Sequence, residues 1–185
     1  EAATGEWGYD YLKLDFLFAG ALDGRRHNPR VTRAQGLHQA LQRIRQAAGD
    51  ETALLGCGCP LGAGIGIFEA MRIGADVAPR WNPAYFGLVA PFEAEPDFPS
   101  VRNALRNVLT RSDLHRRWWT NDPDCILLRE PLKPGEPPEA RAAASHLTVP
   151  EVQCLATVVA LSAGSLFVSD HLPRLSPERV AWLSR

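Results

Sequence analysis

The sequence has 185 residues, 45% of them hydrophobic, and a formal net charge of −1. This length and apolar content predict a single globular domain, residues 1–185, and the chain, which starts at Glu1 without a leader, resembles a piece of a longer protein. Near-neutral charge without a basic stripe argues against a nucleic-acid partner, and the absence of a long apolar run argues against a membrane partner.

In chain order, short apolar segments alternate with segments of helical spacing. The expected strands are Tyr11–Phe16, Ala53–Gly56, Arg72–Val77, Cys125–Leu128 and Leu166–Ser169. The expected helices are Arg33–Ala48, a brief one over about Ile65–Met71, about Ser100–Leu109, Thr148 to about Ala163, and a last one from Ser176. Two loops interrupt the pattern, at 81–98 and at 133–138.

Strands that alternate with helices predict an α/β fold in which βα units form a parallel sheet. The strands end in acidic residues: Asp15, Asp76, Asp124 and Asp170. Polar residues at the carboxyl ends of strands are typical of a (β/α)8 TIM barrel, whose active site lies at that face. About five units are present, somewhat more than half a barrel. A Rossmann sheet is the alternative, disfavoured because no Gly-x-Gly-x-x-Gly follows the first strand.

The first strand carries the strongest candidate site. Lys13 and Asp15 are two residues apart, so in a strand their side chains project to the same face. A lysine and an aspartate at the end of a buried strand are costly unless a ligand or partner uses them. A purely structural ion pair is an equally good interpretation of this stretch taken alone.

The cysteines and histidines do not suggest a metal or cofactor site. The four cysteines are Cys57, Cys59, Cys125 and Cys154, without the paired spacing of a zinc site. We therefore expect buried free thiols, no metal and no cofactor. The five histidines are scattered and suggest no catalytic triad.

Four motifs, taken in order, resemble those of the retaining α-galactosidases (melibiases) of glycoside hydrolase clan D, families 27 and 36. They are Tyr11-Leu12-Lys13-Leu14-Asp15, Arg72-Ile73-Gly74-Ala75-Asp76, Trp119-Thr120-Asn121-Asp122-Pro123-Asp124, and the segment from Leu147 to Leu172. The resemblance covers nearly the whole chain and implies about strands 4–8 of the catalytic TIM barrel.

The turn after the second expected strand departs from both families. Its sequence is Cys57-Gly58-Cys59-Pro60-Leu61, in which the cysteine and the Pro-Leu pair are similar to family 27. Gly58 stands where that family usually has a larger residue that reads the sugar's 2-substituent. The Gly-Gly turn of family 36, followed by Arg and Asp, is absent. The first three strands of the barrel are missing as well.

The resemblance implies a two-aspartate, double-displacement mechanism. Asp15 would be the nucleophile and Asp76 the general acid/base, two carboxyls that a retaining enzyme holds about 5–5.5 Å apart. Lys13 would bind sugar hydroxyls and keep Asp15 ionised, and Arg72 would point at the 2-hydroxyl. The other implied substrate-binding residues are Cys57, Gly58, Trp119 and Asp124. For Trp119 and Asp124, a packed indole and a structural turn cap are competing interpretations.

The expected function is therefore hydrolysis of terminal α-linked galactose, with an α-galactoside oligosaccharide or glycoconjugate as the partner. A transglycosylase of the raffinose-synthase type would use the same two aspartates. A catalytically lapsed barrel that binds sugar is the third interpretation. The sequence leaves open a homo-oligomer of the full-length protein.

Overall fold

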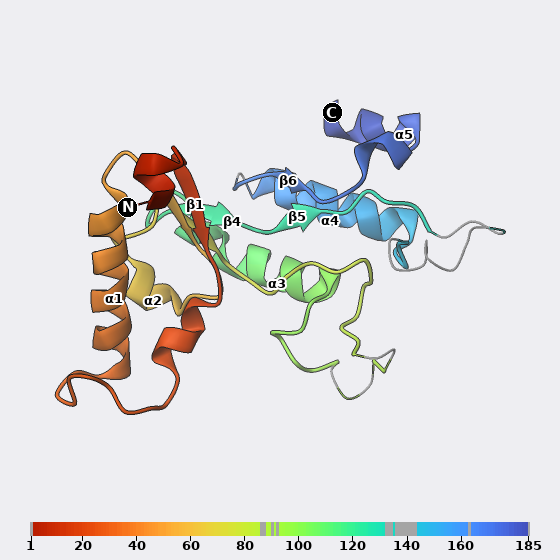
Figure 1. Ribbon diagram of the computed structural model, residues 1–185. Coiled ribbons are helices and arrows are strands. Elements are labelled where there is room, and N and C mark those ends of the chain that lie inside the picture. Colours follow the sequence, from red (N-terminus) through yellow and green to blue (C-terminus); the bar gives the residue numbers. More distant parts are fainter. Residues whose placement is uncertain are drawn as a thin grey trace. The chain divides into compact units, whose positions relative to one another are not determined.

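The computed structural model describes residues 2–85, 88–89, 91, 93–131, 135, 144–162 and 164–184 (Figure 1). The chain divides into two compact units. The first unit comprises Glu1–Ile73 and Asp113–Asp122, and the second comprises Gly74–Ser112 and Pro123–Arg185.

A parallel four-stranded sheet forms the centre of the first unit. Its strands, in spatial order, are β1 (Tyr11–Leu14), β2 (Ala53–Gly56), β3 (Ala70–Arg72) and β4 (Thr120–Asp122). In the register of the sheet, Leu14 lies beside Gly56, Gly56 beside Met71, and Arg72 beside Asp122. The predicted parallel sheet is confirmed, and all four carboxyl ends lie at one edge.

Helix α1 (Arg33–Ala48) has the predicted bounds, and Thr32 caps its start. The Thr32 hydroxyl accepts a hydrogen bond from the Gln35 N–H at 3.2 Å, and the Gln35 side chain accepts one from the Thr32 N–H at 2.9 Å. This reciprocal capping box satisfies two backbone donors that a helix start would otherwise leave unpaired. The helix ends at Gly49, whose φ is +83°. The remaining elements of the first unit are η1 (Ala2–Glu6), η2 (Leu17–Ala21) and α2 (Leu61–Gly64).

The predicted helix at Ile65–Met71 is wrong. The helical turn lies earlier, at α2, and Gly66 then takes a left-handed φ of +77° that ends helical geometry. Met71 belongs to β3, where it is fully buried. Packing of Met71 beside Gly56 in the sheet, rather than the helical spacing of the apolar residues, determines the structure of this segment.

The two faces of β1 have different surroundings. Leu12 and Leu14 pack against a core that includes Leu37 and Leu41 of α1, together with Met71. The side chains between them point to the other face of the sheet, so β1 alternates exposed and half-buried residues. The expectation that Lys13 and Asp15 lie at the end of a buried strand is therefore wrong, because the described part of the chain covers only one face of β1.

The second unit has its own core. Its helices are α3 (Val101–Arg111), α4 (Val149–Leu161) and α5 (Pro177–Ala181), with the short turns η6 (Leu172–Arg174) and η7 (Trp182–Ser184), and η4 (Ser112–Leu114) joins the two units in sequence. Strands β5 (Cys125–Ile126) and β6 (Phe167–Val168) pair in parallel. Leu105 of α3, Leu128 and Leu155 of α4 meet in this core. The helix starts predicted at about Ser100, at Thr148 and at Ser176 are confirmed, and each of these side chains accepts a hydrogen bond from the backbone N–H three residues later.

The structure departs in part from two further expectations and does not test a third. The strand predicted at Arg72–Val77 ends at Arg72, so Asp76 lies in the segment beyond it. Cys57 and Cys59 are buried as expected, but Cys154 is exposed on α4. The loop predicted at 133–138 lies outside the described residues apart from Gly135. Among the described helices, none has the length and apolar character needed to span a bilayer.

Candidate active site

Four polar side chains line up across the carboxyl edge of the four-stranded sheet. Asp15 and Cys57 each come one residue after the paired Leu14 and Gly56, and Arg72 pairs with Asp122. Because Gly56 pairs with Met71, the residue before Arg72, these four positions fall in one register row. Neighbours in a parallel register point to the same face of a sheet. We call Asp15, Cys57, Arg72 and Asp122 the C-terminal row.

Asp15 is held as an ionised, accessible carboxylate. Its pKa is lowered chiefly by a hydrogen bond from the Cys57 thiol; burial opposes this as the second-largest effect, and the Phe16 N–H and Lys13 lower the pKa further. The Phe16 N–H donates to Oδ1 at 2.8 Å, and the Lys13 Nζ lies 3.5 Å from Oδ2. The Asp15 side chain is nevertheless 44% exposed. Lys13 was expected to keep Asp15 ionised; it does lower the Asp15 pKa, but Cys57 lowers it more.

Cys57 is suited to donate rather than to react. Burial and the neighbouring Asp15 carboxylate raise the pKa of this thiol to about 11. Because a thiolate forms only well above neutral pH, the proton stays on sulfur and is available to Asp15.

Gly58 has a conformational reason for being glycine. Its φ is +57°, a left-handed value that a side chain disfavours, and its carbonyl accepts a hydrogen bond from the Phe18 N–H at 2.7 Å. A Cβ at this position would lie 3.4 Å from the Phe18 ring. A role in reading the sugar's 2-substituent stays a prediction.

Arg72 and Asp122 form a buried ion pair at the other end of the row. The Arg72 Nε donates to Oδ2 of Asp122 at 2.9 Å, and the two side chains are 8% and 1% exposed. The charges of this pair also act on Tyr11 of β1. The pKa of Tyr11 is raised, first by burial and then by Asp122, while Lys13 and Arg72 lower it. Part of the Arg72 guanidinium is thus committed to protein, and its contact with a sugar hydroxyl stays a prediction.

The other two acids predicted for the site, Asp76 and Asp124, belong to the second unit. The Asp124 carboxylate accepts the Val77 N–H at 2.7 Å, and the Ser100 N–H donates to the Asp76 carbonyl at 3.1 Å. Asp124 itself takes a left-handed φ of +75°. It therefore fixes the backbone next to Asp76, as a turn-capping aspartate does. A substrate contact by Asp124 and the pairing of Asp76 with Asp15 stay predictions.

Trp119 packs inside the first unit. Its indole N–H donates to the Asn121 side-chain oxygen at 3.1 Å, and only 4% of the residue is exposed. Its ring also makes an edge contact with that of Trp118, at 5.5 Å between centroids. This packing accounts for the tryptophan without a ligand, and its predicted contact with substrate stays a prediction.

Asp122 is the member of the row that sequence reasoning missed. A guanidinium near the end of a buried strand needs a carboxylate partner, and that requirement was the available signal. The sequence offers several aspartates, however, and only the strand register shows that Asp122 lies beside Arg72.

No known family profile matches the chain. The chain is similar to TtGalA, the α-galactosidase from Thermus thermophilus, in its complex with stachyose, with 32% identity and a TM-score of 0.74 over 99% of this chain. The chain has an α-galactosidase-like fold. The same enzyme in complex with p-nitrophenyl α-D-galactopyranoside gives a TM-score of 0.69 at 32% identity over 97% of this chain.

A more distant structure has the same fold. α-Galactosidase I from Mortierella vinacea gives a TM-score of 0.66 over 98% of this chain, at 16% identity. The chain spans 36% and 33% of the two TtGalA structures and 43% of the Mortierella enzyme. The chain thus spans about a third of the length of TtGalA and less than half of that of the Mortierella enzyme.

Proposed function

We propose that this chain is part of the catalytic barrel of a retaining glycosidase that removes terminal α-linked galactose. The observation that carries the proposal is Asp15, an exposed carboxylate kept ionised by Cys57 and Lys13 at the carboxyl edge of a parallel sheet. The relative that is 32% identical along nearly the whole chain was solved with an oligosaccharide, stachyose, and with an aryl α-galactoside.

In this proposal the chain supplies about strands 4–8 of a (β/α)8 barrel. The sheet β1 to β4 provides strands 4–7, and β6 provides strand 8. Strand β5 follows β4 after Pro123 and Asp124, and in this proposal both belong to strand 7. The parallel pairing of β5 with β6 is then the pairing of strand 7 with strand 8. The C-terminal row then lies at the end of the barrel where active sites of this fold are built.

The proposed reaction has two steps. The Asp15 carboxylate attacks the anomeric carbon while Asp76 gives its proton to the departing glycosidic oxygen, which leaves a covalent glycosyl-enzyme ester. Asp76, now a carboxylate, takes a proton from water, which attacks the same carbon and releases Asp15. Two inversions retain the anomeric configuration.

The residues around Asp15 prepare it for this attack. The Phe16 N–H donates to its carboxylate at 2.8 Å, and the Cys57 thiol lowers its pKa. Lys13 lies 3.5 Å from the carboxylate, and its exposed ammonium keeps donors free for sugar hydroxyls. Arg72 helps to hold the far end of the row through Asp122 and is proposed to reach the 2-hydroxyl.

The test replaces the proposed nucleophile in the intact protein. Asp15→Ala should lower the hydrolysis of an aryl α-galactoside by several orders of magnitude, because it removes the attacking atom. The matched control is Asp10→Asn, an exposed aspartate just before the same strand, which should leave the rate unchanged. Equal rates for Asp15→Ala and Asp10→Asn would remove Asp15 from the mechanism.

Azide distinguishes the roles of the two aspartates. Asp76→Ala keeps the nucleophile, so an activated aryl galactoside should give a burst of phenol followed by slow turnover. Azide needs no general base, and it should speed that turnover and form an α-galactosyl azide. With Asp15→Ala, azide should instead enter from the vacated face and give the β-azide. The same anomer from both variants would contradict the assignment.

A further inference from the structure

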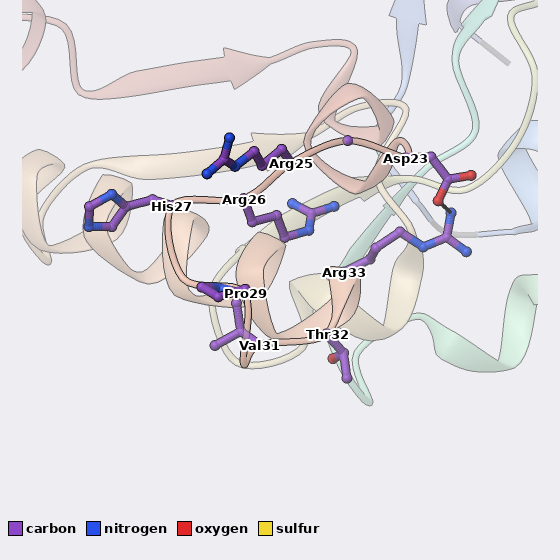
Figure 2. Close-up of a pocket in the computed structure, with 9 residues that line it drawn as sticks. Asp23, Arg25, Arg26, His27, Pro29, Val31, Thr32 and Arg33 are labelled. Atoms are coloured by element: carbon purple, nitrogen blue, oxygen red, sulfur yellow. Dashed lines mark hydrogen bonds and ion pairs between the residues drawn. The ribbon is translucent and has the colours of Figure 1, made fainter.

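A basic pocket opens in the loop between η2 and α1. Its volume is about 560 Å³, and the residues that line it are Asp23, Gly24, Arg25, Arg26, His27, Pro29, Val31, Thr32 and Arg33 (Figure 2). Three arginines stand against a single aspartate in this lining. The pocket therefore carries a surplus of positive charge in a chain whose overall charge is −1.

Two of the arginines hold the loop in shape. The Arg26 guanidinium donates to the carbonyls of Gly20 and Leu22, at 3.2 and 3.0 Å, and so ties the loop back to η2. Arg33 Nη1 pairs with Asp23 Oδ1 at 3.0 Å, which neutralises the only acid of the pocket. These contacts account for the fold of the loop without involving Arg25 or His27.

Arg25 and His27 are exposed, and no residue in the described part of the chain bonds to either side chain. In Figure 2 both extend away from the Asp23–Arg33 pair. An exposed arginine is ordinary in isolation. Here it adds to a pocket whose acid is already neutralised and whose Arg26 keeps its full positive charge.

The positive potential does not come from the start of α1. The capping box between Thr32 and Gln35 already occupies donors of the first turn. The attraction comes instead from guanidinium groups, whose planar donors match the paired oxygens of phosphate and carboxylate.

We propose that this pocket binds a small oxyanion, a phosphate or carboxylate group, with Arg25 as its main charged ligand and His27 as a second donor. The anion could be a free ion or an acidic group on the leaving part of a galactoside. The second source rests on the function proposed above and is suggested by the chain itself, because only η2 and Phe16 separate Asp15 from the start of the loop.

The first measurement is independent of catalysis. Inorganic phosphate is titrated into the intact protein by calorimetry at fixed ionic strength, for the wild type, Arg25→Gln and Arg43→Gln. Arg43 is an exposed arginine further along α1 and serves as the matched control. Loss of one bidentate, charge-assisted contact should weaken phosphate binding about tenfold in Arg25→Gln. Arg43→Gln should bind as the wild type does.

The second measurement identifies the source of the anion. The KM values for phenyl and 4-carboxyphenyl α-galactoside are compared in the wild type and Arg25→Gln. If only the KM for the carboxylated substrate rises, the pocket receives an acidic aglycone. If both KM values stay unchanged while phosphate binding falls, it receives a free anion. Either result supports the site.

The proposal fails if phosphate does not bind, or if it binds equally well to Arg25→Gln and the wild type. A protein that does not hydrolyse either galactoside would count against the proposed function alone. The phosphate titration would still decide the anion site in that case.

Discussion

The buried Arg72–Asp122 pair allows a test of whether Arg72 serves the fold or the sugar. We expect Asp122→Ala to destabilise the protein strongly, because it leaves the guanidinium of Arg72 buried without its carboxylate. Arg72→Met should do the same to Asp122. The double variant, which leaves neither charge behind, should be more stable than the sum of the two single effects indicates.

The structure sets the magnitude of this effect. The side chains are 8% and 1% exposed, so water cannot replace a lost partner, and the Nε–Oδ2 distance of 2.9 Å is that of a good charged hydrogen bond. Breaking such a pair costs about 3–5 kcal/mol. For a cooperative unit the size of this 185-residue chain, each kcal/mol moves the Tm by about 2–4 °C, so the Tm of the single variants should fall by about 10 °C.

Differential scanning calorimetry of the intact protein measures the effect, with Asp113→Asn as the control because Asp113 is an exposed aspartate of the same unit. Galactoside kinetics on the same variants complete the test. If Arg72→Met left the Tm unchanged and raised only the KM, Arg72 would be a sugar ligand and our structural interpretation of the pair would be refuted. Strictly additive effects of the two single variants would refute it as well.

Three further predictions concern the turn at the end of β2. Because the Cys57 thiol lowers the pKa of Asp15 below its ordinary 3.8, Cys57→Ala should raise that pKa and move the acid limb of kcat/KM to higher pH, whereas Cys57→Ser keeps a donor and should move it less. Gly58→Ala should cost about 1–2 kcal/mol in denaturant unfolding, since its φ is +57°, whereas Gly62→Ala within α2 meets no neighbouring atom and should cost nothing; equal effects would contradict the conformational argument. Iodoacetamide at neutral pH should label the exposed Cys154 well before Cys57, which is buried and has a pKa of about 11. Mass spectrometry of the peptides gives the order of labelling, and labelling of Cys57 before Cys154 would contradict the burial of Cys57.

The sequence predicted the elements whose boundaries are encoded locally. Thr32 and Thr148 carry their own capping partners three residues later, so both helix starts were correct. The segment from Ile65 to Met71 was assigned wrongly because its helical spacing competes with the needs of the sheet. Met71 is in a strand because it pairs with Gly56, a residue of another strand. Such a pairing cannot be predicted from a short stretch of sequence around Met71.

The same limit separates the predicted from the missed parts of the site. Lys13 and Asp15 lie on one strand, so their proximity followed from strand geometry and is confirmed by the 3.5 Å ion pair. The hydrogen bond from Cys57 to Asp15 and the pairing of Arg72 with Asp122 join different strands. The spacing along the chain does not encode the register that creates these contacts.

Gly56 restricts the register of β2 and therefore the alignment of the C-terminal row. A Cβ at its position would lie 2.9 Å from Met71 Sδ and 3.0 Å from Phe68 Cε2, so these two buried side chains would have to shift to make room for it. If β2 slipped by one residue in either direction, Leu55 or Cys57 would bring a Cβ into that space, and a glycine would enter the row in place of the thiol. The misaligned sheet would thus have to repack Met71 and Phe68, and it would place no thiol beside Asp15. Gly56, although it lies in the core, thus favours the register that places Cys57 beside Asp15 in the C-terminal row.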